Sequence, residues 1–223
     1  MTSWVSRAQT KGIVEHANSL DAKAFEATYI AEIWLRHKSL RSDTEYEIDL
    51  KSSVSLDSDE LSACYNLIEE TSRPDYESSS FGWDPRRKRK EMKESEMRYL
   101  LVRSATDSSQ SPDRLIEGFL GFMLTHDSVP CVPVLYVYEI HLAESIRGLG
   151  LGAHLMDAVE DIASRVGVEK VMLTCFLSNS KAHAFYQKRG YRTDESSPED
   201  RKTRNKTVKT DYVIMSKALR EEV

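Results

Sequence analysis

Residues 153–166 follow the pattern of an amphipathic helix, with an apolar residue at every third or fourth position. The apolar positions of this stretch are Leu155, Met156, Val159, Ile162, Ala163 and Val166. Residues 134–142, before it, are a β-branched and aromatic run typical of a strand, and a glycine-rich segment joins the two. The sequence therefore predicts a strand, a glycine turn and a half-buried helix in succession.

Helical spacing recurs elsewhere in the chain. Residues 19–37 carry apolar and aromatic side chains at helical intervals, which predicts one long N-terminal helix. Asp57 and Glu60 form a capping box that starts a second helix, and Arg73-Pro74-Asp75 is expected to end it after about residue 71. The other predicted helices begin at Asp84-Pro85 and span residues 179–189.

Alternating or continuous apolar runs predict the strands of a central sheet. These runs are residues 45–51, 97–103, 115–125, 134–142, 170–176, a strand opening at Tyr191, and residues 211–215. Loops are expected at residues 76–83, 104–113 and 195–206. We expect an α/β fold in which residues 1–44 form a helical extension packed on the domain, residues 45–219 form the domain itself, and residues 220–223 are a charged tail.

Composition limits the classes of function. The chain has 223 residues, 40% of them hydrophobic, and a formal net charge of −5, which disfavours direct nucleic-acid binding and suits a basic peptide partner. No apolar run is long enough to span a membrane, and the N-terminus lacks a secretory signal, so we expect a soluble intracellular protein. Cys64, Cys131 and Cys175 lie far apart and indicate neither a disulfide framework nor a metal site.

A basic run at residues 86–90 allows two interpretations. It is either a nuclear address or a patch for an acidic surface, or it is a solvated helix face balanced by Glu91, Glu94 and Glu96. The second interpretation requires nothing beyond ordinary surface chemistry, and we favour it.

The glycine turn suits a phosphate, because backbone N–H groups are exposed where the helix begins. A P-loop is excluded because Ala153 and His154 follow Gly152 where Lys and Ser or Thr are needed, and a dinucleotide fingerprint is disfavoured because Leu155 replaces its third glycine. Arg147-x-x-Gly150-x-Gly152 instead resembles the acetyl-CoA motif of the GCN5-related N-acetyltransferase (GNAT) superfamily. The sequence Asn179-x-x-Ala182-x-x-Phe185-Tyr186-x-x-x-Gly190-Tyr191 is similar to the second motif of that superfamily.

This resemblance implies a GNAT fold, with a twisted, mixed and mostly antiparallel sheet that splays at the acetyl-CoA site and is flanked by helices. It implies acetyl-CoA as co-substrate and no metal. Backbone groups of Ile140, His141 and Leu142 would face the pantetheine arm, and Asn179 would cap its helix or bond that arm. The residues expected at the phosphates are Arg147, Gly148, Leu149, Gly150, Leu151 and Gly152.

Longer stretches narrow the resemblance to the NatD type of N-terminal α-acetyltransferase, which acetylates histones that begin Ser-Gly-Arg-Gly. The similar stretches are Tyr76-Glu-Ser-Ser-Ser-Phe-Gly-Trp83 with the basic run after it, Leu135-Tyr-x-Tyr-Glu139, Val171-Met-Leu-Thr174 and Asp194-x-Ser-Ser-Pro198. Departures from the family pattern are Phe81 where Trp is expected, Tyr186 where Phe occurs, and Val129 where an acidic residue would bind the peptide's arginine.

The attacking α-amine needs only a modest base, because its pKa of about 7.7–8.0 is close to neutral pH. Glu139 is the expected base and Tyr138 the second candidate, as a relay or an orienting hydroxyl. Tyr136 is a peptide wall or a core aromatic, and Tyr186 is either the acid for the leaving thiolate or a packed helix residue. By resemblance the Ile140 N–H stabilises the oxyanion. The side chains of His126 and His141 are interpreted as bystanders.

Peptide recognition is expected from aromatic loops on both sides of the cofactor gap. Tyr76, Phe81 and Trp83 would surround the N-terminal serine, with Tyr212 closing the site from the last strand. The remaining candidates are Asp127, as partner of a substrate arginine, and Thr174 and Tyr138, as hydrogen-bond partners of the peptide.

The resulting hypothesis is transfer of acetyl from acetyl-CoA to the N-terminal serine of histones in a ternary complex. We expect a monomer without an obligatory auxiliary subunit, found in nucleus and cytoplasm, that binds a histone tail but neither nucleic acid nor membrane. Two alternatives remain: a GNAT enzyme for a lysine or small amine, and a non-catalytic acyl-CoA-binding module.

Overall fold

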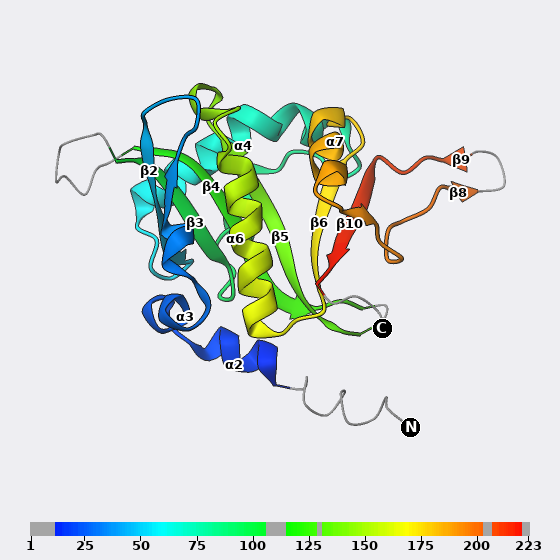
Figure 1. The fold of residues 1–223 in the computed structure, drawn as a ribbon. Helices are drawn as coiled ribbons and strands as arrows, with labels where there is room; N and C mark the ends of the chain where they lie inside the picture. The colour runs from blue at the N-terminus through cyan, green and yellow to red at the C-terminus, as the bar shows by residue number, and fades with distance from the viewer. Residues whose placement is uncertain (1–11, 106–114, 129–130, 203–206, 220–223) are drawn as a thin grey trace.

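The fold is an eight-stranded sheet with helices on both faces, seen in a computed structural model (Figure 1). The structure describes residues 12–105, 115–128, 131–202 and 207–219. The strand order is β1-β2-β3-β4-β5-β6-β10-β7, and every neighbouring pair is antiparallel except β5 and β6. The strands of this sheet are β1 (Arg36–Lys38), β2 (Glu45–Ser52), β3 (Arg98–Ser104), β4 (Ile116–His126), β5 (Pro133–Leu142), β6 (Lys170–Phe176), β7 (Arg192–Thr193) and β10 (Tyr212–Ala218).

Two hydrophobic clusters, one on each face, hold the helices to the sheet. Helix α6 (Leu151–Val166) crosses one face over β5 and β6, together with α2 (Ile13–Ser19) and α3 (Ala22–Tyr29). Helix α4 (Ser58–Ser78) covers the other face at β4 and β5, and α5 (Pro85–Glu91) follows it. Helix α7 (Ser180–Lys188) packs beside β6. The GNAT architecture expected from the sequence, a mixed sheet flanked by helices, is therefore confirmed.

The sequence pattern of α6 was sufficient to predict both its buried face and its two ends. All six apolar positions of the predicted stripe are buried, and Gly150 and Gly167 cap the helix in left-handed conformation with φ of 91° and 89°. A residue with a Cβ is strained in that conformation, so the glycines fix both ends of the helix.

The single N-terminal helix predicted over residues 19–37 is wrong. The segment forms the end of α2, then α3 and a short 3₁₀ helix, η1 (Glu32–Leu35), before β1 pairs with β2. Asp21 starts a new helix by accepting a bond from the N–H of Ala24. The buried Arg98 guanidinium then donates to Ala17 O and to Leu20 O at 3.0 and 2.9 Å, which satisfies carbonyls that the break leaves free.

The expected break at Pro74 is also wrong, because α4 continues through this proline to Ser78. The predicted capping box at Asp57 and Glu60 is present. Proline removes one helical N–H bond, but Arg73 spans the position by pairing with Glu69 and Glu77 on either side of it. Residue Tyr76, expected in a loop, therefore lies in the last turn of α4.

The remaining elements lie within one or two residues of their predicted bounds, except that β10 ends at Ala218, three residues later than predicted, and that one expected loop contains a strand. The polar stretch 195–206 was expected to be loop, but β8 (Arg201–Lys202) pairs there with β9 (Thr207–Val208). Most of the predicted loop at 104–113 lies outside the described residues. Among the helices that the structure describes, none has the length and apolar character needed to cross a membrane.

Candidate active site

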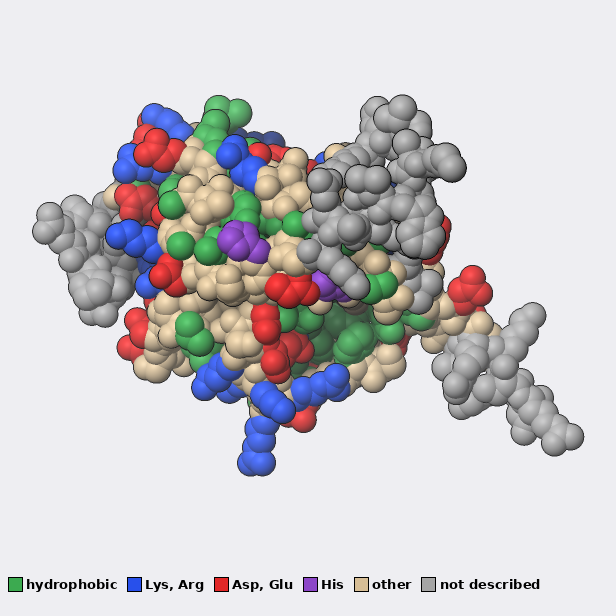
Figure 2. All heavy atoms as spheres, turned by 90° about the horizontal axis from the view of Figure 1, so that it is seen from below, with side chains coloured by type: hydrophobic (Ala, Val, Ile, Leu, Met, Phe, Trp, Pro, Cys, Tyr) green, Lys and Arg blue, Asp and Glu red, His purple; other side chains and the backbone are tan. Residues whose placement is uncertain are grey.

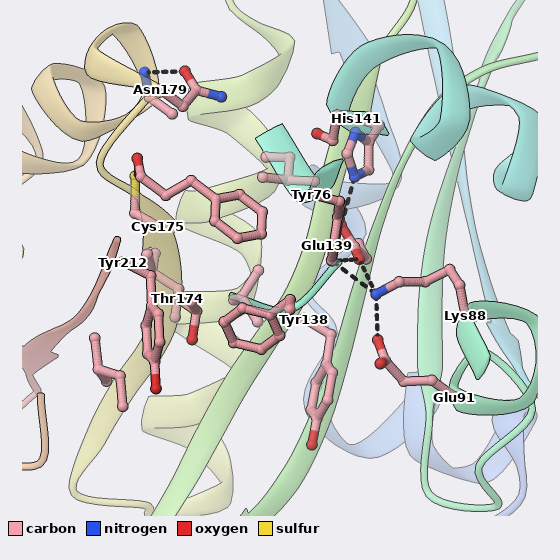
Figure 3. A pocket seen from close by; sticks show the side chains of 18 of the residues that line it. Tyr76, Lys88, Glu91, Tyr138, Glu139, His141, Thr174, Cys175, Asn179 and Tyr212 are labelled. Atoms are coloured by element: carbon pink, nitrogen blue, oxygen red, sulfur yellow. Dashed lines mark hydrogen bonds and ion pairs between the residues drawn. The ribbon is translucent and has the colours of Figure 1, made fainter. Parts of the chain in front are cut away.

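The site lies where β5 and β6 separate. Their parallel pairing covers only Val134–Val137 against Lys170–Leu173, although β5 continues to Leu142 and β6 to Phe176. A cavity of about 400 Å³ opens beside the unpaired halves. Figure 3 shows Glu139 and His141 on one side of it and Thr174, Cys175 and Tyr212 on the other. The splay implied by the family resemblance is therefore present.

A β-bulge at Tyr138 orients the key side chains. Strand β4 pairs Gly121 with Glu139 and Phe122 with Val137, so Tyr138 is an extra residue in β5. Val137 packs in the core under α6, and Ile140 faces the same cluster. Without the extra residue, Glu139 would share the face of Val137, because strand side chains alternate. The bulge instead turns Glu139 toward α4, into the cavity.

Glu139 is held by three donors. Its Oε1 accepts bonds from Lys88 Nζ at 2.8 Å and Tyr76 Oη at 2.9 Å, and its Oε2 lies 2.6 Å from His141 Nε2 (Figure 3). The side chain is only 10% exposed. Burial alone would raise the pKa of Glu139, but Lys88 and His141 outweigh it and lower this pKa to about 2. Glu139 is thus an ionised and weakly basic carboxylate.

Lys88 is the unexpected member of this network. It belongs to the basic run interpreted as a solvated helix face, which holds for Arg86, Arg87, Arg89 and Lys90 but not for Lys88, whose side chain is 7% exposed. Its ammonium bonds Glu139, Tyr76 and, at 2.7 Å, Glu91. Burial would lower the pKa of Lys88, but these neighbours raise it above its ordinary value, so the lysine stays charged.

The bystander interpretation of the His141 side chain is also wrong. The imidazole is buried, and its two nitrogens contact Glu139 and, at 2.5 Å, the hydroxyl of Thr71 on α4. His126, by contrast, is exposed at the end of β4, as a bystander would be.

Aromatic side chains from both sides of the gap close the cavity. Phe81 lies with its ring centroid 4.9 Å from that of Tyr212 and 5.7 Å from that of Phe176, and Tyr76 packs on Phe176 and Trp83. A hydrogen bond of 3.0 Å from Ser80 Oγ to Asp211, with a second bond from the Ser80 N–H, ties the loop after α4 to the start of β10. The four aromatics predicted to bind peptide all line the cavity. We call this set, Tyr76, Phe81, Trp83 and Tyr212, the aromatic wall.

The two tyrosines of β5 differ in their freedom. Tyr136 shares a 2.6 Å hydrogen bond with Thr174 that bridges β5 and β6, and burial raises its pKa to about 12. Tyr138 is 39% exposed in the cavity, 5.2 Å from the Tyr136 ring, and burial raises its pKa as well. Both phenols therefore remain protonated at neutral pH. Thr174, predicted to bond the peptide, lines the cavity and has Tyr136 as its hydrogen-bond partner in this structure.

Tyr186 lies deeper. It is buried, lines the cavity from α7, and has a pKa raised by burial. Cys175 lies beside it on β6, and burial raises the pKa of this thiol to about 11. Tyr186 is thus both the packed aromatic and a cavity hydroxyl, so the two sequence interpretations are compatible.

The glycine turn has a geometry that suits phosphates. Gly148 and Gly150 have positive φ of 76° and 91°, and the first amides of α6 point out of its N-terminus without helical partners. Arg147 Nε donates to Leu142 O, which fixes its guanidinium beside the turn. Asn179 caps α7 by accepting from the N–H of Ala182, as predicted. These groups fit a pyrophosphate at the turn and an extended acyl arm along the open edge of β5.

Asp127 does not fit its predicted role. The carboxylate is buried and forms a 2.8 Å ion pair with Lys170, and it is not among the residues that line the cavity. An aspartate already neutralised by a lysine has little attraction for a substrate arginine. Val129 lies outside the described residues.

Sequence reasoning missed Lys88, His141 and Glu91. A basic run and a lone histidine have no local feature that marks a buried ion pair, because the partner is 51 residues away for Lys88. The one signal available in the sequence was the alternation of side chains along β5. Neighbouring strand residues such as Tyr138 and Glu139 cannot both face the cavity unless the strand bulges, so predicting both in the site implied a bulge.

In the described part of the chain, no group of three or more His, Cys, Asp or Glu residues is arranged to hold a metal ion. Figure 2 shows hydrophobic side chains in a hollow on the face seen from below, with acidic and basic side chains close beside it.

Comparisons with known proteins agree with this geometry. The family model described as "Acetyltransferase (GNAT) family" matches residues 61–191, more than half of the chain. Among curated proteins, N-alpha-acetyltransferase 40 of Saccharomyces cerevisiae is 31% identical over 100 residues, which is 38% of this chain and 35% of that protein. Spermidine/spermine N(1)-acetyltransferase-like protein 1 of Homo sapiens is 26% identical over 133 residues, 59% of this chain and 17% of that protein. The matches thus span about a third or less of these relatives.

Solved structures share the fold. Arabidopsis thaliana NAA60 in complex with a bisubstrate analogue superposes with a TM-score of 0.55 at 11% identity, covering 77% of this chain and 97% of that one. A GNAT acetyltransferase of Staphylococcus aureus Mu50 gives a TM-score of 0.54 at 13% identity, covering 78% and 99%. From the family match, the shared fold, and the glycine turn beside a splayed strand pair, the chain belongs to the GNAT family of acetyltransferases.

Proposed function

We propose that this acetyltransferase transfers the acetyl group of acetyl-CoA to the α-amino group of an N-terminal serine, in histones that begin Ser-Gly-Arg-Gly. The observation that carries the proposal is the cavity at the splay, where Glu139 lies beside Tyr138 and the aromatic wall. The NatD-like stretches of the sequence and the similarity to yeast N-alpha-acetyltransferase 40 support it.

The electrostatics of Glu139 favour an α-amine over a lysine. A carboxylate with a pKa of about 2 is a weak base, so it cannot readily deprotonate a lysine ammonium with a pKa of about 10.4. An α-amino group, with a pKa of about 7.7–8.0, is partly neutral at pH 7 without help. Glu139, directly or through a water, then only needs to receive the proton released as the amide forms.

The cofactor side of the site is assigned to the glycine turn and the open edge of β5. When bound, acetyl-CoA supplies the thioester whose carbonyl is attacked. Residues Arg147–Gly152 would hold its phosphates, and Asn179 and the backbone of Ile140, His141 and Leu142 its pantetheine arm. The Ile140 N–H would donate to the oxyanion, and the protonated Tyr186 hydroxyl to the leaving sulfur.

The acceptor side is assigned to the aromatic wall, which has room for a small N-terminal residue. The Tyr138 hydroxyl, exposed in the cavity and protonated, would orient the amine or relay its proton. The net charge of −5 suits a basic histone tail. We propose that the enzyme meets this partner in the nucleus and cytoplasm. We propose that it acts as a monomer.

A small amine is the second candidate, because the human spermidine/spermine-like relative aligns over more of the chain than the yeast one. A polyamine site needs carboxylates that are free to pair with the ligand. In the cavity both Glu139 and Glu91 already bond Lys88, which favours a peptide acceptor.

The test is one set of incubations with acetyl-CoA and three acceptors: a peptide that begins Ser-Gly-Arg-Gly and carries an internal lysine, the same peptide with a blocked N-terminus, and spermidine. We expect CoA release with the free peptide alone, and fragmentation that places the acetyl group on the serine nitrogen. An acetyl group found on an internal lysine, or turnover with spermidine instead of the peptide, contradicts the proposed acceptor. Acetyl-CoA binding by calorimetry without turnover on any acceptor would indicate a non-catalytic binding module.

A further inference from the structure

The hydrogen bonds of Thr71 determine which nitrogen of His141 carries a proton. The Thr71 hydroxyl donates to Leu67 O on the preceding turn of α4, at 2.7 Å. A hydroxyl has one hydrogen, so toward His141 Nδ1, 2.5 Å away, the Thr71 oxygen is an acceptor. His141 Nδ1 is therefore protonated.

The second nitrogen then requires a second proton. A neutral imidazole with a proton on Nδ1 has only a lone pair on Nε2. Yet Nε2 lies 2.6 Å from Glu139 Oε2, which is an acceptor when the carboxylate is ionised. Two acceptors do not approach to this distance without a hydrogen between them, so the His141–Glu139 pair holds one proton more than a neutral histidine would bring.

The neighbours of Glu139 place that proton on the imidazole. Lys88 and Tyr76 both donate to Oε1 and fill its two lone pairs, and they keep Glu139 ionised. His141 fills one lone pair of Oε2, which leaves one acceptor position on the carboxylate. This last position is where an amine N–H or a bridging water can bond.

We propose that His141 is a positioning residue that acts through Glu139: in its imidazolium form it blocks, and in its neutral form it permits, passage of the substrate's proton through the carboxylate. The inference rests on the proposed function, since it needs an amine acceptor. The arrangement in the structure corresponds to the loaded state, with the proton already stored on Nε2.

The proton step balances with the transfer. As the amine nitrogen forms the new C–N bond to the acetyl carbon, the C–S bond breaks and the sulfur leaves with the electron pair. One N–H proton of the amine passes to the free position of Glu139 Oε2, and the carboxyl passes a proton on to the lone pair of neutral His141 Nε2. Solvent in the cavity then takes the proton from the pair and resets it.

The surroundings contain several other ionisable groups, and the pKa values of the lysine and the tyrosines among them are raised further from neutral pH. Helix α5 contributes Lys88, whose pKa is raised, and β4 presents only the uncharged ring of Phe119, 5.5 Å from the imidazole between centroids. The other groups facing the pair are Tyr76 from α4, Glu91 from α5, Tyr99 from β3 and Tyr186 from α7. The pKa values of these three tyrosines are raised by burial.

The first test needs no catalysis and no variant of the pair. Long-range ¹H–¹⁵N NMR of the wild-type protein distinguishes an imidazolium from either neutral tautomer as the pH is varied over about 5 to 9. We expect His141 to change from two protonated nitrogens to a neutral ring protonated on Nδ1. A ring that remains a neutral Nε2–H tautomer throughout this range overturns the inference. Because no acceptor is present, this result is independent of the proposed function.

The second test compares kcat/KM of wild type and His141→Gln across the same pH range. Glutamine can still donate to Glu139 but does not titrate, and the titration of the substrate amine cancels in the ratio of the two rates. We expect the ratio of wild-type kcat/KM to variant kcat/KM to fall about tenfold per pH unit below the NMR midpoint of His141. This slope is the one expected when activity requires the loss of one proton. A ratio that is constant with pH refutes the role of His141 even if the peptide is acetylated.

Two variants accompany this comparison. Thr71→Val removes the acceptor for Nδ1–H, so it should move the acid limb to lower pH while leaving the histidine in place. His126→Gln changes an exposed histidine at the end of β4, and its profile should match wild type. If Thr71→Val has the wild-type acid limb, the donor assignment on which the inference depends is wrong.

Discussion

Replacing Lys88 with methionine tests the buried ion pair at the centre of the site. The Lys88 and Glu139 side chains are 7% and 10% exposed, and Nζ lies 2.8 Å from Oε1. Methionine fills similar volume but leaves the carboxylate in a buried position without its main cation. Removal of one partner of a buried pair usually destabilises a protein by about 3–5 kcal/mol.

The pKa of Glu139 gives an independent magnitude. It is about 2 in the folded protein, against 4.5 for an ordinary glutamate. A carboxyl with a lowered pKa stabilises the folded state above its unfolded pKa, and this contribution disappears as pH falls through the folded pKa. The difference corresponds to about 3 kcal/mol at neutral pH, shared between Lys88 and His141. The share held by Lys88, together with the cost of leaving the carboxylate buried without its cation, leads us to expect that Lys88→Met lowers the free energy of unfolding at pH 7 by about 3 kcal/mol.

The sign of the pH dependence follows from the same reasoning. Without Lys88, burial raises the pKa of Glu139, so the variant can protonate this group at mildly acidic pH and relieve the buried charge. The stability difference between wild type and variant should therefore shrink between pH 7 and pH 4. Urea unfolding followed by tryptophan fluorescence measures it at both pH values.

Two controls separate the ion pair from general damage to α5. Lys90→Met alters an exposed lysine of the same helix and should change stability by less than about 0.5 kcal/mol. In a Glu139→Gln background, Lys88→Met should destabilise much less, because no carboxylate is stranded. A loss below about 0.5 kcal/mol for Lys88→Met in the wild-type background, or an equal loss at pH 7 and pH 4, would refute the reasoning.

Three further substitutions, one of them a control, test the glycine turn and the N-terminal helices. Gly150→Ala should destabilise the protein by about 1–2 kcal/mol, since φ is 91° and the new Cβ would lie 3.3 Å from His37. The same substitution should weaken acetyl-CoA binding about tenfold or more, as measured by calorimetry. Gly167→Ala, with φ of 89° at the other end of α6, is the control and should lose similar stability with unchanged affinity. Equal losses of affinity in the two variants would contradict a role for the turn. Arg98→Met leaves the carbonyls of Ala17 and Leu20 without their donor. Hydrogen exchange should therefore accelerate first in α2 and α3, because the free energy of opening this region falls by about 2–3 kcal/mol. Uniform acceleration over the whole sheet would count against this local role.

The sequence predicted the bounds of those helices whose apolar stripe and capping residues lie within the helix or next to it. Helix α6 carries its apolar stripe and both glycine caps within residues 150–167, and α5 is started by Asp84, which accepts bonds from the N–H groups of Arg86 and Arg87. Strands β2, β3, β4, β5, β6 and β10 were predictable because each is an alternating or continuous apolar run, whereas the short strands β1, β8 and β9 lack such a run and were not predicted. The glycine turn likewise indicates a phosphate site through the spacing of its glycines alone.

Tertiary contacts decided where helices begin and end in the two places where local signals were weak or misleading. The chain between α2 and α3 breaks where Asp21 caps a new helix and where Arg98, about 80 residues later, reaches the carbonyls of the break. Helix α4 continues past Pro74 although the proline removes one helical hydrogen bond, with ion pairs of Arg73 on either side of it and with Tyr76 placed in the site.

By itself, the sequence determined the strand, glycine turn and α6, because side-chain periodicity and glycine spacing are local properties. Its resemblance to the GNAT superfamily implied the fold and made Tyr138, Glu139 and the aromatic wall candidates for the site. Only the tertiary structure decided that Glu139 faces the cavity, that Lys88 is buried against it and that His141 holds its other oxygen. These three facts depend on the bulge at Tyr138 and on contacts between residues up to 70 positions apart, which no periodic pattern encodes.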